Sequence, residues 1–123
     1  GLILIGGYAM DRLRYQETLS PVNQAPAVNL LRDAVKLMDA GKLFIGTICH
    51  SLWLFCADST LIEGRKVTCA HNIVCDVINA GGELVAERGQ TVDLHQDGGL
   101  VTGKHPGCVD AFVERFKTCI LAM

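Results

Sequence analysis

Residues 43 to 53 read Leu43-Phe44-Ile45-Gly46-Thr47-Ile48-Cys49-His50-Ser51-Leu52-Trp53, and this stretch decides the fold. Its first six residues form an apolar run that predicts a buried strand over residues 43–48. Residues 52–57 predict a helix, so Cys49 stands directly between a strand and a helix. This is the strand–turn–helix context of a nucleophile elbow, in which a reactive side chain is held above an α/β sheet.

Cys49 in this setting has the features of a reactive thiol. The start of the following helix carries a partial positive charge, which favours the thiolate over the thiol. We expect the turn to hold Cys49 in a strained backbone conformation. The backbone N–H of His50 would face an oxyanion beside the sulfur, and its imidazole would act as a base or proton carrier near neutral pH. The alternative is that Cys49 only fills the core, as cysteines after buried strands often do.

Outward from the elbow, short apolar runs alternate with amphipathic segments. Strands are expected over residues 2–5, 43–48, 66–70, 83–86, 91–94 and 100–102, with helices over 26–40, 52–57 and 73–80 and from residue 109 onward. This alternation predicts an α/β fold with a largely parallel sheet and right-handed crossovers. Ligands of such sheets bind at the carboxyl ends of the strands, which here are Gly6-Gly7 and Cys49-His50.

Two helices carry clear apolar faces. The first begins at Pro26, ends at Gly41 and repeats Val28, Leu31, Val35 and Met38 near helical spacing. The last helix places its apolar residues on one face: Val109, Phe112, Val113, Phe116 and Ile120. The charged residues Asp110, Glu114, Arg115 and Lys117 fall elsewhere on this helix.

Gly6-Gly7 and Asp11 form the second candidate cluster. A Gly-Gly after a strand usually marks a tight turn, but it also allows a close backbone approach that would supply a second oxyanion N–H. Asp11 follows in a short helical turn. Its carboxylate would either stabilise the helix dipole or orient an imidazole.

Composition limits the classes of function. The chain has 123 residues and a formal net charge of -2, with no basic cluster, so we expect no nucleic-acid or membrane partner. No apolar run approaches the roughly 20 residues that span a bilayer. The six cysteines lack Cys-x-x-Cys or zinc-type spacing, so we expect free thiols, no metal site and a reducing cytoplasm. Cys56 is interpreted as a packing residue.

The chain begins at once with a buried-type strand. Such strands need neighbours on both sides, so we infer that the natural protein extends upstream; a self-sufficient small domain is the alternative.

Five segments, in order, resemble motifs of the ThiJ/PfpI family (DJ-one superfamily). They are Ile5–Arg14 with its Gly-Gly-x-x-x-Asp-x-x-Arg, Thr47–Ser51 with its Ile-Cys-His, Leu61–Thr68, Asp76–Glu83 and Leu100–Gly107. The likeness is greatest to the PfpI-like branch, because an acidic residue follows Gly-Gly and a histidine follows the cysteine. It implies a flavodoxin-like three-layer sandwich, of which residues 1–123 would be the C-terminal portion.

The resemblance also implies roles. Cys49 would be the nucleophile, His50 its partner, and the amides of Gly7 and His50 the oxyanion hole. Asp11 would reach the histidine of a neighbouring subunit, so the resemblance implies a homodimer or higher oligomer. The residues expected to line the pocket are Gly6, Tyr8, Ser51, His71 and His105, with surface or core positions as the alternative for the two histidines.

Two classes of function compete. The first is a cofactor-free enzyme of the hydrolase, glyoxalase or deglycase type, in which a thiolate attacks a carbonyl-type small-molecule or peptide substrate. The second is a non-enzymatic stress-response chaperone or cysteine redox sensor, which also needs an accessible, ionisable thiol. A glutaminase is disfavoured, because no His-x-Glu follows Pro106.

Overall fold

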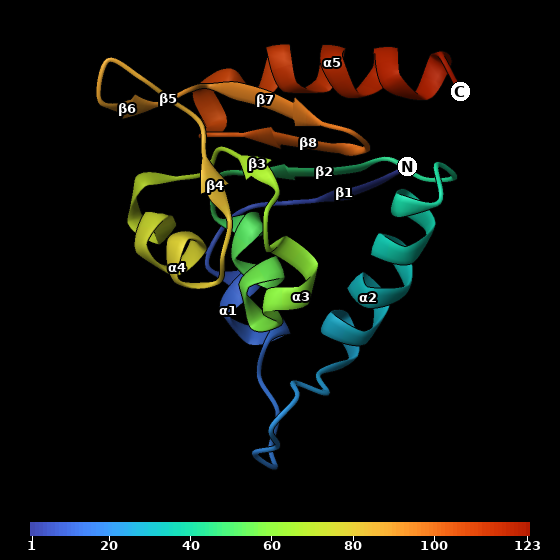
Figure 1. Ribbon diagram of the computed structural model, residues 1–123, viewed down its shortest axis with the longest axis vertical. Coiled ribbons are helices and arrows are strands. Elements are labelled where there is room, and N and C mark those ends of the chain that lie inside the picture. The colour runs from blue at the N-terminus through green and yellow to red at the C-terminus, as the bar shows by residue number, and fades with distance from the viewer.

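The computed structural model describes residues 1–123 and has three layers (Figure 1). A four-stranded sheet contains β1 (Leu2–Leu4), β2 (Ile45–Ile48), β8 (Leu100–Gly103) and β7 (Leu94–Asp97), in that order. Strands β1, β2 and β8 run parallel, and β7 is antiparallel to β8. The predicted α/β fold with a mainly parallel sheet is therefore confirmed.

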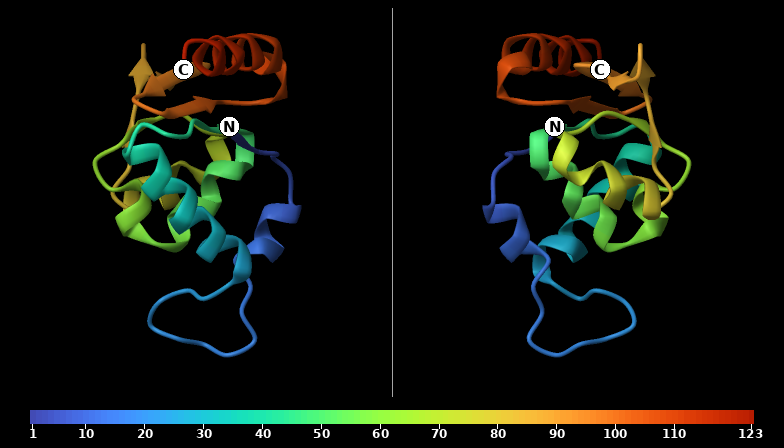
Figure 2. Two further views of the ribbon diagram at one scale, coloured as in Figure 1. Left: turned by 90° about the vertical axis from the view of Figure 1, so that its right-hand side faces the viewer. Right: turned by 90° about the vertical axis from the view of Figure 1, so that its left-hand side faces the viewer.

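One face of the sheet is covered by α5 (Val109–Leu121), and the other elements lie mostly on the opposite side (Figures 1 and 2). The helices there are α1 (Ala9–Leu13), α2 (Pro26–Asp39), η1 (Cys49–Ala57), α3 (Ser59–Ile62), η2 (His71–Ile73) and α4 (Val74–Asn79), while η3 (Pro106–Cys108) precedes α5. None of these helices combines the length and apolar character that crossing a membrane requires.

Two small strand pairs extend the structure. Strand β3 (Lys66–Val67) pairs in parallel with β4 (Glu83–Leu84), and β5 (Ala86–Glu87) pairs with β6 (Gln90–Thr91) as a hairpin. The strand predicted over 66–70 is thus shorter, and the one predicted over 91–94 is divided between β6 and β7. Thr68 explains the early end of β3, because its N–H is donated to the Thr102 hydroxyl rather than to a neighbouring backbone carbonyl.

The main core lies between the sheet and α2. The predicted apolar face of α2 is buried, with Val28, Leu31, Val35 and Met38 all at most 5% exposed. A smaller core lies under α5, where Phe112 and Phe116 pack against Gly46 of β2. A Cβ at Gly46 would lie 2.7 Å from Phe112 Cζ, so this glycine lets α5 approach the sheet.

The prediction for the face of α5 is only partly right. Phe112 and Phe116 are buried, but Val109 and Val113 are 44% and 46% exposed. Neither valine belongs to the small core under α5.

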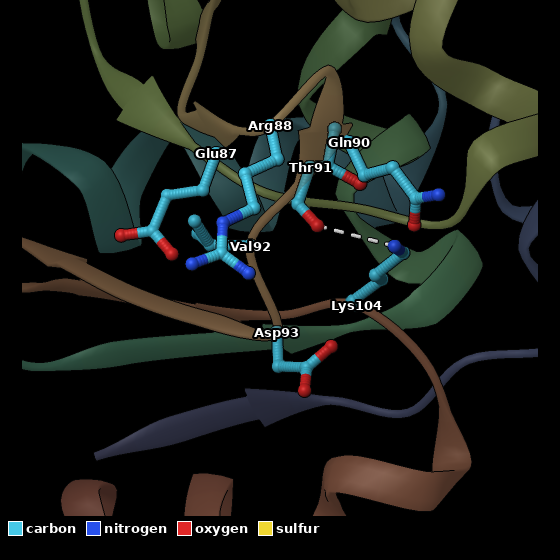
Figure 3. Close-up of a pocket in the computed structure, with 7 residues that line it drawn as sticks. All are labelled: Glu87, Arg88, Gln90, Thr91, Val92, Asp93 and Lys104. Atoms are coloured by element: carbon cyan, nitrogen blue, oxygen red, sulfur yellow. Dashed lines mark hydrogen bonds between the residues drawn. The ribbon is translucent and has the colours of Figure 1, made fainter.

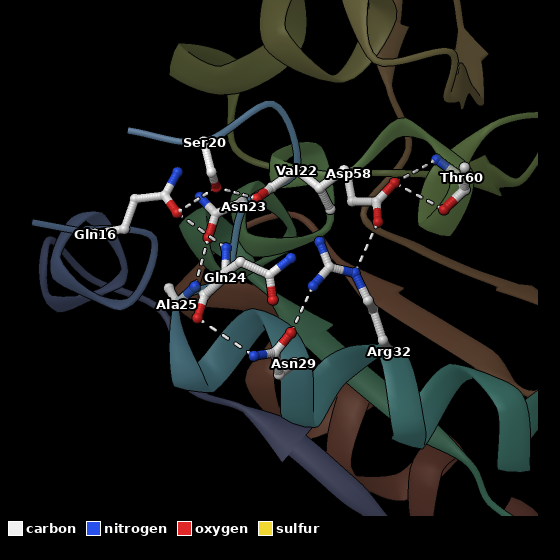
Figure 4. A network of polar contacts seen from close by, with 10 residues as sticks. All are labelled: Gln16, Ser20, Val22, Asn23, Gln24, Ala25, Asn29, Arg32, Asp58 and Thr60. Carbon is white, nitrogen blue, oxygen red and sulfur yellow. Dashed lines mark hydrogen bonds and ion pairs between the residues drawn. The ribbon is translucent and has the colours of Figure 1, made fainter. Parts of the chain in front are cut away.

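Residues 15–25 form a loop that hangs away from the sheet (Figure 2). Polar side chains close it: Gln16 accepts from Ser20 and from the amide of Gln24, and Asn23 accepts from the amide of Ala25 (Figure 4). Asn23 also donates to the carbonyl of Arg14 at 2.9 Å. The loop thereby fixes the end of α1 next to the start of α2.

Candidate active site

Cys49 joins β2 to η1 in a left-handed backbone conformation, with φ of 61°. Arg88 is the only other non-glycine residue with positive φ. Such a conformation costs roughly 1–3 kcal/mol for a residue with a side chain. The strained turn predicted from the sequence is confirmed, although η1 begins at Cys49 itself, three residues earlier than expected, and is a 3₁₀-helix. The Cys49 residue is partly exposed rather than enclosed in the core.

Gly6 lies against this turn. A Cβ at Gly6 would lie 2.8 Å from the carbonyl oxygen of Ile48 and 3.2 Å from Cβ of Cys49, so no other residue fits without a shift of backbone. The approach follows from topology, because β1 and β2 are adjacent and parallel and their carboxyl ends meet. Gly7, next along, has φ of 104°, and its amide N–H donates no hydrogen bond within the chain.

His50 and Asp11 form a hydrogen-bonded pair within one chain. Asp11 Oδ1 lies 2.9 Å from His50 Nε2, and the two side chains are 51% and 13% exposed. Because α1 packs against η1, Asp11 lies beside His50 of its own chain. The contact with a histidine of a neighbouring subunit, which the family resemblance implies, stays a prediction.

The other imidazole nitrogen of His50 is free. Nδ1 is buried and has no hydrogen-bond partner, and the Cys49 thiol makes no hydrogen bond to it. An ionised Asp11 can only accept, so Nε2 carries the proton when the imidazole is neutral, and Nδ1 is then the basic nitrogen. The residue next to the thiol thus offers an unoccupied proton acceptor.

Two hollows open beside Cys49. The first, of about 420 Å³, is apolar and is lined by Ile5, Gly6, Gly7, Ile48, Cys49, Pro106 and Val109. The second, of about 400 Å³, is more polar and is lined by Tyr8, Cys49, Ala70, His71, Asn72, Lys104 and His105. Gly6, Tyr8, His71 and His105 accordingly line cavities that include the Cys49 residue, as expected from the sequence.

Ser51 does not line either hollow, so this expectation is wrong. Its side chain is buried, accepts from the Ile48 amide at 2.8 Å and donates to the Ile48 carbonyl at 2.9 Å. Ser51 therefore closes the first turn of η1 from within. The Ser51 hydroxyl thus supplies hydrogen-bond partners for the N–H and C=O of Ile48, which backbone groups at a helix end often lack.

Several lining residues were not singled out from the sequence. Pro106 and Val109 follow β8, which is parallel to β2, so the segment after β8 reaches the same edge of the sheet as Cys49. The parallel pairing of β2 with β8 is the feature from which these two lining residues could have been predicted. Trp53 was also missed: its ring lies 5.6 Å from the His50 ring, centroid to centroid.

A further hollow, of about 570 Å³, lies at the β5–β6 hairpin and excludes Cys49 (Figure 3). Lys104 borders it, and its ammonium donates to the carbonyl of Thr91 at 3.1 Å. Lys104 also borders the polar hollow beside Cys49, but this bond engages its charged end at the hairpin.

The remaining cysteines differ from Cys49 in their surroundings. All six are free thiols, of which Cys69, Cys108 and Cys119 are buried and Cys75 is exposed. Burial raises the pKa of Cys56 to about 11 and that of Cys69 to about 12. Both therefore stay protonated near neutral pH and are poor nucleophiles.

Comparison with known proteins gives consistent matches. The family model described as "DJ-1/PfpI family" matches residues 1–118. "Deglycase PfpI" of Pyrococcus furiosus is 33% identical over 115 residues, which cover 94% of this chain and 58% of the relative. "Protein/nucleic acid deglycase 2" of Escherichia coli is 34% identical over 111 residues, which cover 90% of this chain and 55% of the relative. The chain thus spans a little over half the length of these relatives.

Solved structures share the fold. The two-domain protein from Anabaena variabilis, with DJ-1/ThiJ/PfpI-like and ferritin-like domains, superposes with a TM-score of 0.72 at 25% identity, covering 96% of this chain and 29% of that one. Drosophila melanogaster DJ-1beta gives 0.67 at 18% identity, covering 92% and 53%. Together with the family model over nearly the whole chain, these matches show that the chain belongs to the DJ-1/PfpI family.

Proposed function

We propose that this chain carries the reactive centre of a deglycase-like enzyme that acts on carbonyl-type substrates through Cys49. The observation that carries the proposal is the left-handed Cys49 at the β2–η1 junction, bordered by two hollows and followed by a paired His50. The names of the relatives from Pyrococcus furiosus and Escherichia coli support the deglycase class.

In the proposed first step, His50 Nδ1 accepts the thiol proton and Cys49 Sγ attacks the carbonyl carbon. A C–S bond forms, and the carbonyl π electrons move to oxygen. The free amide of Gly7, and the amide of His50, would donate to this oxyanion. Asp11 would stabilise the imidazolium that forms on His50, because the carboxylate accepts its Nε2 proton.

In the second step, a substrate whose carbonyl carbon carries an amine releases that amine: the imidazolium protonates the nitrogen, the C–N bond breaks and a thioester remains. A 2-oxoaldehyde has no leaving group. In that case the hemithioacetal carbon gives up its proton, the neighbouring carbonyl carbon gains one, and the electrons that move between the two carbons leave a 2-hydroxy thioester. A water molecule then attacks the thioester-level carbon, and the thiol is regenerated. These steps need no oxidant and no cofactor, so the substrate and water balance the reaction.

The two hollows suggest how a small-molecule or peptide substrate would be oriented. The apolar hollow at Ile5, Pro106 and Val109 suits a hydrocarbon group. The polar hollow at Tyr8, His71 and His105 offers hydrogen-bonding groups to a hydroxyl or amide. A compact carbonyl adduct with one apolar and one polar end would place its carbonyl carbon at the sulfur between them.

The test compares turnover by the protein and by two variants. Cys49→Ser should abolish turnover of small 2-oxoaldehydes and of glycated amines, whereas Cys56→Ser should leave it within about 2-fold, because Cys56 lies on the same helix away from both hollows. Equal turnover by Cys49→Ser and the unmodified protein would overturn the proposal. Protection of client proteins without any turnover would favour the chaperone class instead. Cytoplasmic location and a homo-oligomeric state remain predictions.

A further inference from the structure

The hydrogen bonds of His50 do not fix its imidazole. Its single bond goes to Asp11, whose side chain is half exposed, and its other nitrogen has no partner. One hydrogen bond to a half-exposed carboxylate does not by itself set the plane of the ring, so the groups packed around the imidazole must do so. Something else must hold the plane of the ring if Nδ1 is to face the thiol reproducibly.

Trp53 is the group that supplies this constraint. Its ring lies 5.6 Å from the His50 ring at an interplanar angle of 39°. Tyr8 also approaches His50, at 6.3 Å, but it is 82% exposed and its hydroxyl makes no hydrogen bond that would hold it. Trp53 is partly buried against the main core. The fixed neighbour of the imidazole is therefore the indole.

The indole is itself held from two further elements. The Arg14 guanidinium carbon lies 3.7 Å from the ring centroid, and Arg14 Nη1 donates to the Trp53 carbonyl at 3.2 Å. On α4, Asp76 Oδ2 accepts from Trp53 Nε1 at 2.9 Å. A cation over an indole face is a favourable contact, worth about 0.5–2 kcal/mol according to how far it is desolvated.

This arrangement connects α1, η1 and α4 to one ring. Arg14 follows α1, which also carries Asp11, and the Asn23 amide fixes the Arg14 carbonyl. The same short segment thus supplies both the partner of His50 Nε2 and the clamp on the ring beside it. A shift of α1 would move both at once.

We propose that Trp53, clamped by Arg14 and Asp76, is a positioning residue that fixes the His50 imidazole with Nε2 on Asp11 and Nδ1 toward the reacting group. The inference rests on the proposed function, since it describes how that chemistry is organised. It assigns to the Arg14–Trp53–Asp76 cluster a role in rate rather than in substrate binding, because none of the three lines a hollow beside Cys49.

The first test uses Trp53→Leu and Trp53→Phe. Loss of the ring in Trp53→Leu should lower kcat by about 10-fold with KM within about 2-fold, since a small misplacement of a catalytic group costs rate rather than affinity. Trp53→Phe retains an aromatic wall and should recover most of the rate. A residue that only packs would instead lower the fraction of folded protein and leave the kcat of the folded protein unchanged.

The second test avoids the core. Asp76 is exposed, so Asp76→Ala should fold normally, release the indole N–H and lower kcat several-fold, while Asp76→Asn keeps an acceptor and should retain activity. Asp33→Ala, an exposed carboxylate on α2, is the matched control and should change nothing.

The outcomes separate the two claims. Cys49-dependent turnover that is unchanged in folded Trp53→Leu and in Asp76→Ala overturns the positioning role and leaves the proposed function standing. Absence of Cys49-dependent turnover in the unmodified protein overturns the proposed function, and the inference with it.

Discussion

Asp11 Oδ1 and His50 Nε2 lie 2.9 Å apart in a single chain, although 38 residues separate them in the sequence. The contact exists because β1 and β2 are neighbours in the sheet, so the segments after them leave from the same edge. An acid–imidazole pair made within one chain does not need a second subunit. Its consequence for activity can be measured directly.

Asp11→Ala should lower kcat by about 10-fold or more, because the imidazolium loses its carboxylate partner. Mixing and refolding this variant together with Cys49→Ser distinguishes the two possible arrangements. With the pair made within the chain, no hybrid contains an intact centre, and activity should not exceed the sum of the two variants. Restored activity in the mixture would show that Asp11 acts across subunits.

Gly6→Ala should disrupt the elbow. Its new Cβ would lie 2.8 Å from the Ile48 carbonyl oxygen, so the backbone before Cys49 has to move. We expect a loss of about 1–3 kcal/mol in the free energy of unfolding, as for overpacking elsewhere, together with slower alkylation of Cys49.

Gly41→Ala is the matched control for this change. Gly41 has φ of 75° and open space around it, so alanine there introduces backbone strain without a clash. It should cost about 1 kcal/mol and leave Cys49 alkylation unchanged. Equal alkylation rates in Gly6→Ala and Gly41→Ala would contradict the close approach of β1 to the elbow.

Stability should fall at alkaline pH because of Cys69. Burial raises its pKa from 9.0 to about 12, so the folded state keeps a proton that the unfolded state releases above pH 9. The contribution is fully present below pH 9 and is lost as pH rises toward 12, with a limiting slope of about 1.4 kcal/mol per pH unit. Urea denaturation between pH 8 and pH 11 should show a smaller decline for Cys69→Ala, while exposed Cys75→Ala keeps the slope of the unmodified protein. Identical slopes for all three would refute the assignment.

The sequence was sufficient for the features that depend on local pattern. The apolar run before Cys49 and the helix after it predicted both the parallel sheet and the strained backbone of Cys49. The spacing of Val28, Leu31 and Met38 likewise predicted the buried face of α2. These properties follow from periodicity and from the residue types at a turn.

Features that depend on pairing in space were harder to predict. The partner of Asp11 follows from which strands are adjacent, and the sequence gives strand order only indirectly. Ser51 was expected in the pocket from the family resemblance, but a 3₁₀ turn places its hydroxyl against the backbone of Ile48. The role of Trp53 needs α1, η1 and α4 to be placed together, which no single motif encodes.

The central claim is that Cys49 alone among the six cysteines is both exposed to a cavity and poised to react. Timed alkylation with iodoacetamide at pH 7, followed by peptide mass spectrometry, measures the rate at each cysteine in the native protein. We predict that Cys49 is modified at least about 10-fold faster than exposed Cys75, because Cys49 borders two hollows and is followed by His50, whose Nδ1 has no hydrogen-bond partner and can accept the thiol proton. A Cys49 rate equal to or below that of Cys75 would contradict the account.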